Sequence, residues 1–350
     1  MGKYKRSYFA DDEYRLVSEI ERRQWSDFVL HHPQGNIFQT PEMYEVYKNT
    51  KNYTPIFIGV VNPDNHLVGT LLANIIKEYS SIWGNLTSRS IIRGGPIVKD
   101  NNEDVFQLLL TGYNNFVKNK VIYTQVRNLS NCSNTRNLFE IEGYTYEEHL
   151  DILIDLTKSE DNLEMQMHKE RRHNIRRAIN KGTTIEELKK LDKIKYTYEL
   201  IKETHKRVKH PLADESLFHA AYNVLHPKKM IRYFFAVNNN KIIGVRIVLC
   251  YKEVVYDWYA GSTYEDRNKY PNDLLPWKVV LWSKRNGYKV FDFGGAGKPG
   301  IPYGVRNYKL KFGGHLVNFG RYIKIHKPLF MKIGTFGFKL YRKVGGTRNP

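Results

Sequence analysis

The chain has 350 residues, a formal net charge of +19 and 41% hydrophobic residues. This length exceeds what one hydrophobic core usually supports, so we expect two domains with packed interiors. The excess of positive charge suggests a polyanionic partner, which is RNA, a diphosphate or an anionic membrane face. A dispersed lysine-rich surface without a partner is the alternative until the charges are shown to cluster.

The cysteine and histidine patterns exclude several kinds of site. Cys132 and Cys250 are the only cysteines, and their wide separation supports neither a disulfide framework nor a cysteine metal site. The histidines have no carboxylates at metal-ligand spacing, and no serine, histidine and aspartate arrangement resembles a nucleophilic triad. We therefore expect no metal and no covalent catalysis.

The sequence also shows no membrane-spanning signal. No apolar run reaches the ~18 residues that a spanning helix needs, and the first residues lack the apolar region of a signal peptide. Together with the cysteine usage, this predicts a protein of the reducing cytoplasm. Peripheral contact with the inner face of the membrane remains compatible with the charge.

In chain order, the first half alternates between helical and strand patterns. Helices are predicted at Trp25–Leu30 and Glu42–Lys48, with Pro41 opening the second helix. The remaining predicted elements are a strand at Thr54–Val61, its hairpin partner at Leu67–Ile76, a helix at Glu103–Lys118 and a strand at Val121–Arg127.

The second half repeats the order of helix, hairpin, strand, helix and strand. Its predicted elements are the strands Ile231–Val237, Lys241–Leu249 and Val254–Ala260, the helix Asn272–Arg285 and a strand from Val290. A repeat near half the chain length predicts two copies of one mixed α/β unit.

A strongly basic helix is predicted at the midpoint, between His168 and its natural C-cap Gly182. At helical spacing its side chains form two faces, one with Lys169, Arg172 and Arg176 and another with Ile175, Ala178 and Ile179. The basic face fits an RNA backbone or acidic lipid headgroups, and a solvated helix face is the alternative.

Glycine and positive charge gather after the predicted strand Val290–Phe293. The span contains the glycines 294, 295, 297 and 300 and the cations Lys298, Arg306, Lys309 and Lys311. Pro299 and Pro302 rule out the helix that a dinucleotide fingerprint requires. We read the span as strand, loop and strand, and expect an active site where an anionic group meets amide N–H donors and cations. A glycine-rich corner between two buried strands is the alternative.

Several motifs together suggest a known family. They are Gly35–Pro41, Gly95–Pro96, Arg171–Ala178, Thr204–Arg207, Phe291–Gly295 and Tyr308–Gly313. In order and combination these motifs resemble the Fem family of peptidoglycan bridge-forming aminoacyltransferases. Members of this family move an amino acid from its tRNA ester to an amine on a peptidoglycan precursor.

The resemblance implies a mixed α+β fold of two tandem GNAT-like acyltransferase domains. The first domain is expected at residues 1–157 plus 321–350 and the second at residues 158–320. The expected partners are aminoacyl-tRNA and an amine of a peptidoglycan or cell-envelope precursor, and the reaction needs no cofactor. An acyl-CoA-dependent N-acyltransferase acting on a sugar or small amine, and a non-catalytic RNA-binding module, are the alternatives.

The resemblance also implies roles for individual residues. Lys309 matches a lysine at the catalytic centre, and Arg207 matches an arginine that holds the nucleotide diphosphate of the acceptor. A phosphate-binding lysine of the first domain is expected where Tyr47 stands, so the neighbouring Lys48 is its candidate replacement. The other predicted substrate-binding residues are Tyr308, Arg306, Gly294 and Gly295.

Two of these assignments have specific limits in the sequence. The acidic residue that follows Gly-Pro in the family is displaced here, with Lys99 before Asp100, so the sequence assigns no general base. Arg207 also stands four residues after Glu203, and an ion pair on one helix face is the alternative to a phosphate contact.

Overall fold

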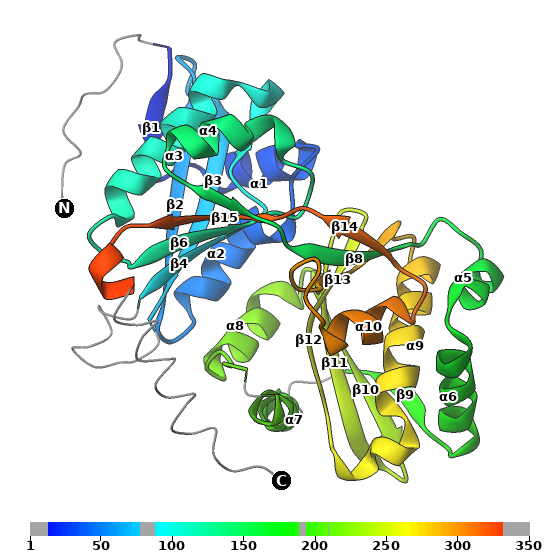
Figure 1. Ribbon diagram of the computed structural model, residues 1–350. Helices are drawn as coiled ribbons and strands as arrows, with labels where there is room; N and C mark the ends of the chain where they lie inside the picture. Colours follow the sequence, from blue (N-terminus) through cyan, green and yellow to red (C-terminus); the bar gives the residue numbers. More distant parts are fainter. Residues whose placement is uncertain (1–12, 78–87, 189–193, 209, 332–350) are drawn as a thin grey trace. The chain divides into compact units, whose positions relative to one another are not determined.

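The computed structural model describes residues 13–77, 88–188, 194–208 and 210–331, which form two compact units, each containing one β-sheet (Figure 1). The first unit takes the chain up to Tyr44, then Thr54–Tyr146 and the chain from Tyr322 on. The second takes Glu45–Tyr53 and Glu147–Arg321. Both units mix helices with strands, which confirms the predicted fold class.

The described strands of the first unit pair in the order β1-β2-β3-β4-β6-β15-β7, with β5 added to β3. Their bounds are Arg15–Val17 (β1), Tyr53–Val61 (β2), Leu67–Ile76 (β3), Arg89–Arg93 (β4), Ile97–Val98 (β5), Tyr123–Arg127 (β6), Thr145–Glu147 (β7) and Arg321–Ile325 (β15). Because β15 lies between β6 and β7, the end of the described chain returns to the first sheet. The expected first domain extends further, but residues 1–12 and 332–350 lie outside the described residues.

The helices of the first half are α1 (Arg22–His31), α2 (Pro41–Lys48), α3 (Glu103–Val117) and α4 (Arg136–Ile141). The α3 helix begins where the side chain of Asn102 accepts a hydrogen bond from the N–H of Val105 at 3.0 Å. Val105, Leu109 and Tyr113 follow at i, i+4 spacing and are fully buried against the first sheet. The core of the first unit therefore lies between α3 and this sheet.

The described strands of the second unit pair in the order β14-β8-β13-β12-β11-β10-β9. Their bounds are Leu150–Asp155 (β8), Thr184–Glu187 (β9), Ile231–Asn238 (β10), Lys241–Tyr251 (β11), Val254–Ser262 (β12), Val290–Gly295 (β13) and His315–Asn318 (β14). Residues 147–157, expected in the first domain, lie in the second unit because β8 pairs with β13 and β14.

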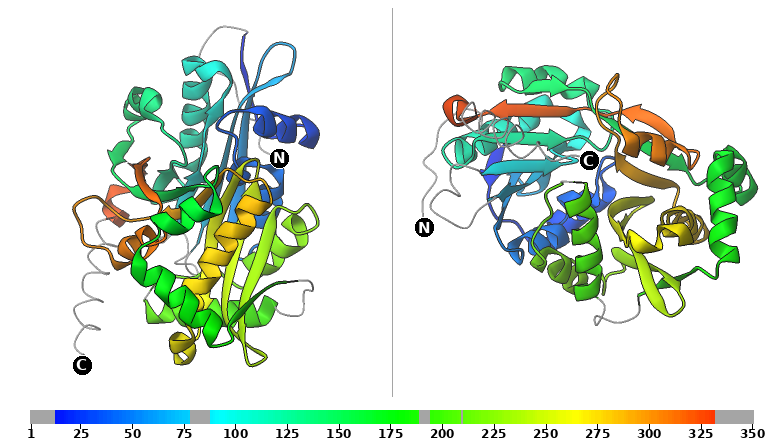
Figure 2. Two further views of the ribbon diagram at one scale, coloured as in Figure 1. Left: turned by 90° about the vertical axis from the view of Figure 1, so that its right-hand side faces the viewer. Right: turned by 60° about the horizontal axis from the view of Figure 1, so that its bottom comes forward.

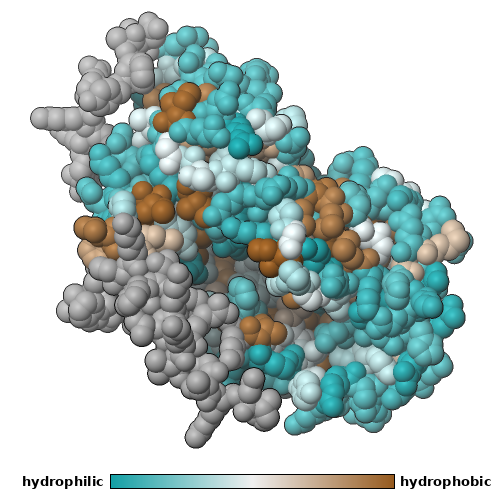
Figure 3. Space-filling view, in the orientation of Figure 1, coloured by the Kyte–Doolittle hydropathy of each residue, from teal (hydrophilic) through white to brown (hydrophobic). Residues whose placement is uncertain are grey.

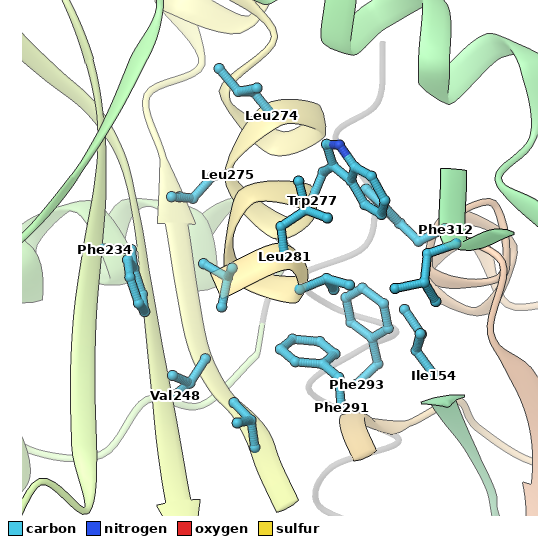
Figure 4. Packing of buried hydrophobic residues seen from close by; sticks show 14 of the residues in the cluster. Ile154, Phe234, Val248, Leu274, Leu275, Trp277, Leu281, Phe291, Phe293 and Phe312 are labelled. Atoms are coloured by element: carbon cyan, nitrogen blue, oxygen red, sulfur yellow. The ribbon is translucent and has the colours of Figure 1, made fainter. Parts of the chain in front are cut away.

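The helices of the second half are α5 (Glu160–Gln166), α6 (Lys169–Asn180), α7 (Ile194–Arg207), α8 (Ser216–Leu225), α9 (Pro271–Arg285) and α10 (Gly304–Leu310). The α9 helix packs against β10 and β11 on one side and against α6 on another (Figure 2). Its residues Trp277 and Leu281 meet Phe291, Phe293 and Phe312 in the main core of the unit (Figure 4). The strand before the glycine-rich segment is thus fixed by aromatic packing.

Two local predictions were wrong. Gly304–Leu310 is the helix α10 and not a strand, and its side chains follow helical spacing: Tyr308 and Phe312 lie four residues apart with ring centroids at 5.4 Å. Ile179 does not face the core with Ile175 and Ala178, because it is 50% exposed. Its position one turn after Arg176 places it at the edge of the basic face.

Within the described residues, no helix combines the length and the apolar character needed to cross a membrane.

Candidate functional site

The glycine-rich loop starts where β13 separates from β12. These two strands pair in parallel up to the partners Tyr256 and Asp292, and the pairing of β13 with β8 is irregular between Asp292 and Gly295. The backbone of Gly294 and Gly297 has positive φ, +69° and +76°, which favours glycine there. The chain thus leaves β12 directly after Asp292 and pairs once more with β8, at Gly295 opposite Asp151.

Lys309 ties the start of this loop to α10. Its ammonium donates to the carbonyl oxygens of Phe293 at 2.6 Å, Gly294 at 3.3 Å and Gly295 at 2.9 Å. These are three consecutive residues, so one side chain fixes the path of the backbone as it leaves the sheet. Burial lowers the pKa of Lys309, while the neighbouring carboxylates Asp257 and Asp151 oppose that shift.

Carboxylates surround this ammonium from three strands. Asp292 accepts a hydrogen bond from the N–H of Gly294 at 2.6 Å. Burial and the nearby charge of Asp151 raise the pKa of Asp292 to about 7. Asp257 pairs with Arg246 at 2.5 Å, and burial raises the pKa of Asp257 as well. The loop therefore lies over a buried cluster of charges.

The other three cations of the span also contact protein acceptors. Arg306 donates to the carbonyl of Ala296 at 2.7 Å and to that of Lys298. Lys298 itself lies 3.1 Å from Glu147, and Lys311 lies 2.5 Å from Glu170. Lys309 and Arg306 therefore hold loop carbonyls from the same helix, while Lys298 and Lys311 form partly exposed ion pairs.

Gly294 and Gly295 allow close approach by the protein's own side chains. A Cβ on Gly294 would lie 3.1 Å from the hydroxyl of Tyr256, and one on Gly295 would lie 3.1 Å from Nε2 of His149 and 3.6 Å from Arg321. We expected a ligand to lie against this backbone, and the structure places a tyrosine and a histidine side chain there.

Tyr308 packs within the fold beside the loop. Its hydroxyl donates to the carbonyl of Asn272 at 2.5 Å, and burial raises its pKa to about 12. The guanidinium of Arg171 lies 4.8 Å from its ring centroid and pairs with Asp273. Tyr308 therefore joins α10 to α6 and α9.

Arg207 and Lys48 stand apart from these contacts. Arg207 lies 3.6 Å from Glu203 on its own helix, and its guanidinium is 5.6 Å from the ring centroid of Tyr264. The helix-surface ion pair that the sequence offered as the alternative is therefore present. Lys48 is the exposed last residue of α2.

The basic face of α6 borders a groove against α5. The groove is lined by Asp161, Glu164, Met165, Lys169, Arg172, His173 and Arg176. Arg172 donates to the backbone carbonyls of Glu164 and Met165, and Arg176 lies 3.8 Å from Glu164. The predicted basic face thus gathers Lys169, Arg172 and Arg176 in one groove.

The described residues contain no cluster of histidine, cysteine or carboxylate side chains fit to hold a metal.

The residues that sequence reasoning missed are the buried charges. Arg246 stands inside the apolar strand β11, and Asp292 stands between two core phenylalanines. A charge within a buried strand requires a partner, so these two positions carried a usable signal. Asp257 gave the same signal as the only charge in β12, whereas Asp151 gave none.

Comparisons with known proteins agree with this architecture. Residues 169–310 match a family model described as an acetyltransferase (GNAT) domain, which supports acyl transfer as the class of reaction. No curated protein matches the chain in sequence.

Solved structures match over nearly the whole chain. FemX is 17% identical with a TM-score of 0.71, covering 91% of this chain and 99% of that chain. A tandem GNAT protein from the clavulanic acid biosynthesis pathway is 10% identical with a TM-score of 0.61, covering 90% and 99%. The C-terminal domain of a putative lysylphosphatidylglycerol synthetase from Agrobacterium fabrum is 12% identical with a TM-score of 0.56, covering 91% and 95%. The chain therefore has the Fem-like double GNAT fold that its motifs predicted.

Proposed function

We propose that this protein transfers an aminoacyl group from aminoacyl-tRNA to an amine of a peptidoglycan or other cell-envelope precursor. The observation that carries the proposal is the likeness to FemX across 91% of this chain and 99% of that chain. The similar synthetase domain from Agrobacterium fabrum, whose name combines a lysyl group with a phospholipid, supports an aminoacyl donor on this fold.

The candidate site supports the aminolysis of an ester through its charge and its fixed loop. The reaction needs an aligned amine and a positive or dipolar environment for the oxyanion that develops. Lys309 places an ammonium beside the loop, and its three contacts with consecutive carbonyls hold the loop in one conformation. We assign Lys309 to this site, together with the loop residues Gly294 and Gly295 and with Tyr308 and Arg306 on α10.

The donor's polyanionic character matches the basic groove. Lys169, Arg172 and Arg176 present positive charge between α5 and α6, where a phosphate backbone gains charge-assisted contacts. Arg207 and Lys48 remain the candidates for phosphate groups of the acceptor. An anionic membrane face is a second partner for the same charge, in line with an envelope substrate.

The second candidate function is acyl-CoA-dependent N-acylation of a sugar or small amine. The match of residues 169–310 to an acetyltransferase model favours it. The deciding experiment offers the purified protein charged tRNA and acetyl-CoA in parallel, each with a panel of amine acceptors. Product formed from charged tRNA alone supports the proposal, and product formed from acetyl-CoA alone overturns it.

A further inference from the structure

A buried cluster beneath the glycine-rich loop contains more negative than positive side chains. Its three carboxylates come from β8, β12 and β13, and its two cations come from β11 and α10; they are Asp151, Asp257, Asp292, Arg246 and Lys309. All five lie in the second unit. The cluster thus places three carboxylates beside two cations.

The hydrogen bonds show how the surroundings of Asp292 differ from those of Asp257. Arg246 contacts one oxygen of Asp257 at 2.5 Å. Lys309 donates to three backbone carbonyls, so it acts on the carboxylates through its charge. Asp292 receives the N–H of Gly294 at 2.6 Å. Its ionised form therefore depends on one amide and on the field of Lys309.

Asp292 also occupies the position next to the loop. It is the last β13 residue paired with β12, opposite Tyr256. Phe291 and Phe293 on either side of it point into the core (Figure 4). Because successive side chains of a strand alternate between its faces, the carboxyl of Asp292 lies on the face away from that core.

A group in this environment can exchange a proton near neutral pH. Burial and the charge of Asp151 raise the pKa of Asp292 to about 7, while Gly294, on the loop, and Lys309, on α10, lower it. Asp257 on β12 raises it further, and Arg246 on β11 is the cation paired with Asp257. A base with such a pKa suits proton transfer at the pH of the cytoplasm.

Resting on the proposed acyl transfer, we propose that Asp292 is the proton acceptor for the attacking amine. The nitrogen lone pair attacks the ester carbonyl carbon, and the N–H proton passes to the carboxylate of Asp292. The bond between that carbon and the ribose oxygen then breaks, and its electron pair stays on the oxygen. The oxygen takes the proton back from Asp292, so the step needs no further reactant.

The test is the pH dependence of kcat/KM in Asp292→Asn, Asp292→Glu and Asp151→Asn. Wild type is expected to gain activity with rising pH through a limb centred near 7. Asp292→Asn is expected to lose about 100-fold or more at alkaline pH and to lose this limb, and Asp292→Glu to keep a limb. Asp151→Asn is expected to move the limb to lower pH, because it removes the neighbouring charge.

Thermal unfolding of each variant separates this role from a structural one, since asparagine preserves the size of Asp292 and an oxygen for Gly294. A folded Asp292→Asn protein with wild-type rate and an unchanged limb overturns the proposal. The proposal is also overturned if the limb in the pH profile of Asp151→Asn stays at the wild-type pH.

A substrate-free measurement keeps this test independent of the donor. In a ¹³C NMR titration of aspartate carboxyls, the signal that disappears in Asp292→Asn is expected to titrate near 7, and titration near the ordinary 3.8 overturns the proposal. If acetyl-CoA alone supports turnover, the proposed donor is wrong and the pH profiles are measured with acetyl-CoA. If neither donor is used, the proposed function fails and the titration alone decides the protonation of Asp292.

Discussion

The ammonium of Lys309 lies 2.6 Å from the carbonyl oxygen of Phe293, the last core aromatic before the glycine-rich loop. The contact joins α10 to the end of β13 and places a positive charge where the loop begins. Lys309 therefore combines two properties: it fixes the loop, and it supplies positive charge.

If the ammonium of Lys309 stabilises charge that develops in the transition state, replacing Lys309 with methionine is expected to lower kcat by about 100-fold or more. The substitution also removes the hydrogen bonds to three carbonyls. Arginine is expected to restore only part of the rate, since its planar guanidinium does not reproduce the contacts of a compact ammonium. Turnover at saturating donor measures both effects.

Lys311→Met is the matched control for this prediction. Lys311 is only two residues away, but it pairs with the exposed Glu170. Its loss is expected to leave turnover close to wild type, as exposed ion pairs contribute little. Equal, near-wild-type rates in the two methionine variants would remove Lys309 from the catalytic assignment.

Arg246→Met is expected to destabilise the fold by roughly 3–5 kcal/mol, because it leaves the buried carboxylate of Asp257 without its cation. Urea unfolding measures the loss. The control is Arg232→Met, which breaks a more exposed pair with Glu187 at 3.2 Å and is expected to cost about 1 kcal/mol or less through that pair. Similar losses of unfolding free energy in both variants would show that the Arg246–Asp257 pair stabilises the fold no more than the Arg232–Glu187 pair does.

Local periodicity predicted most of the fold. The hairpin around Asn238–Asn240 and the helix Glu103–Lys118 each contain a complete local pattern, and the structure confirms both with ends shifted by a residue or two. The helix α10 was misread because short cationic segments fit either period, and its packing partner Arg171 lies far away in sequence.

Only part of the candidate site could be predicted from the sequence, because its other residues meet through contacts between distant segments. Family motifs pointed to Lys309 and the glycines, and the structure brings these together. The carboxylates Asp151 and Asp257 join them only through strand pairing between distant segments. The irregular register of β13 that brings Asp151 opposite Gly295 has no local signature in the sequence.

If Arg207 holds a phosphate of the acceptor, Arg207→Ala is expected to raise the acceptor KM several-fold, roughly 1 kcal/mol or more, with a smaller change in kcat. Glu203→Ala is the control, because it removes the other half of the same ion pair. An acceptor KM that changes equally in both variants would assign Arg207 to the helix surface alone.

The unfolding free energy is expected to depend on Asp292. Its folded pKa of about 7 lies above the ordinary 3.8, so between these values the folded protein binds more protons than the unfolded chain. Stability therefore falls as pH rises through this window, by at most about 4 kcal/mol from this group. Asp292→Asn is expected to remove that loss, so its stability relative to wild type is greater above the window than below it.

Urea unfolding on both sides of the window measures this difference. Asp64→Asn, at an exposed turn, makes the same chemical change and is expected to alter stability little at either pH. A constant difference between Asp292→Asn and wild type across the window would contradict the raised pKa.

The groove between α5 and α6 is predicted to contribute to tRNA binding. Its surroundings are mostly hydrophilic (Figure 3), and Lys169, Arg172 and Arg176 line it. Reversing these three charges to glutamate is expected to weaken tRNA binding and to reduce the slope of log Kd against log salt, because fewer counterions are released. Filter binding across a salt series measures both quantities.

A control triple of Lys118, Lys228 and Lys229, all exposed, changes the net charge equally when reversed to glutamate. If the general field of the +19 chain alone attracts tRNA, both triples are expected to lose affinity equally. If the groove variant alone shows a larger loss of tRNA affinity and a smaller slope of log Kd against log salt, phosphate contacts are assigned to α6. If the groove variant binds tRNA as wild type does but no longer binds vesicles of anionic lipid, the groove is assigned to contact with the membrane face.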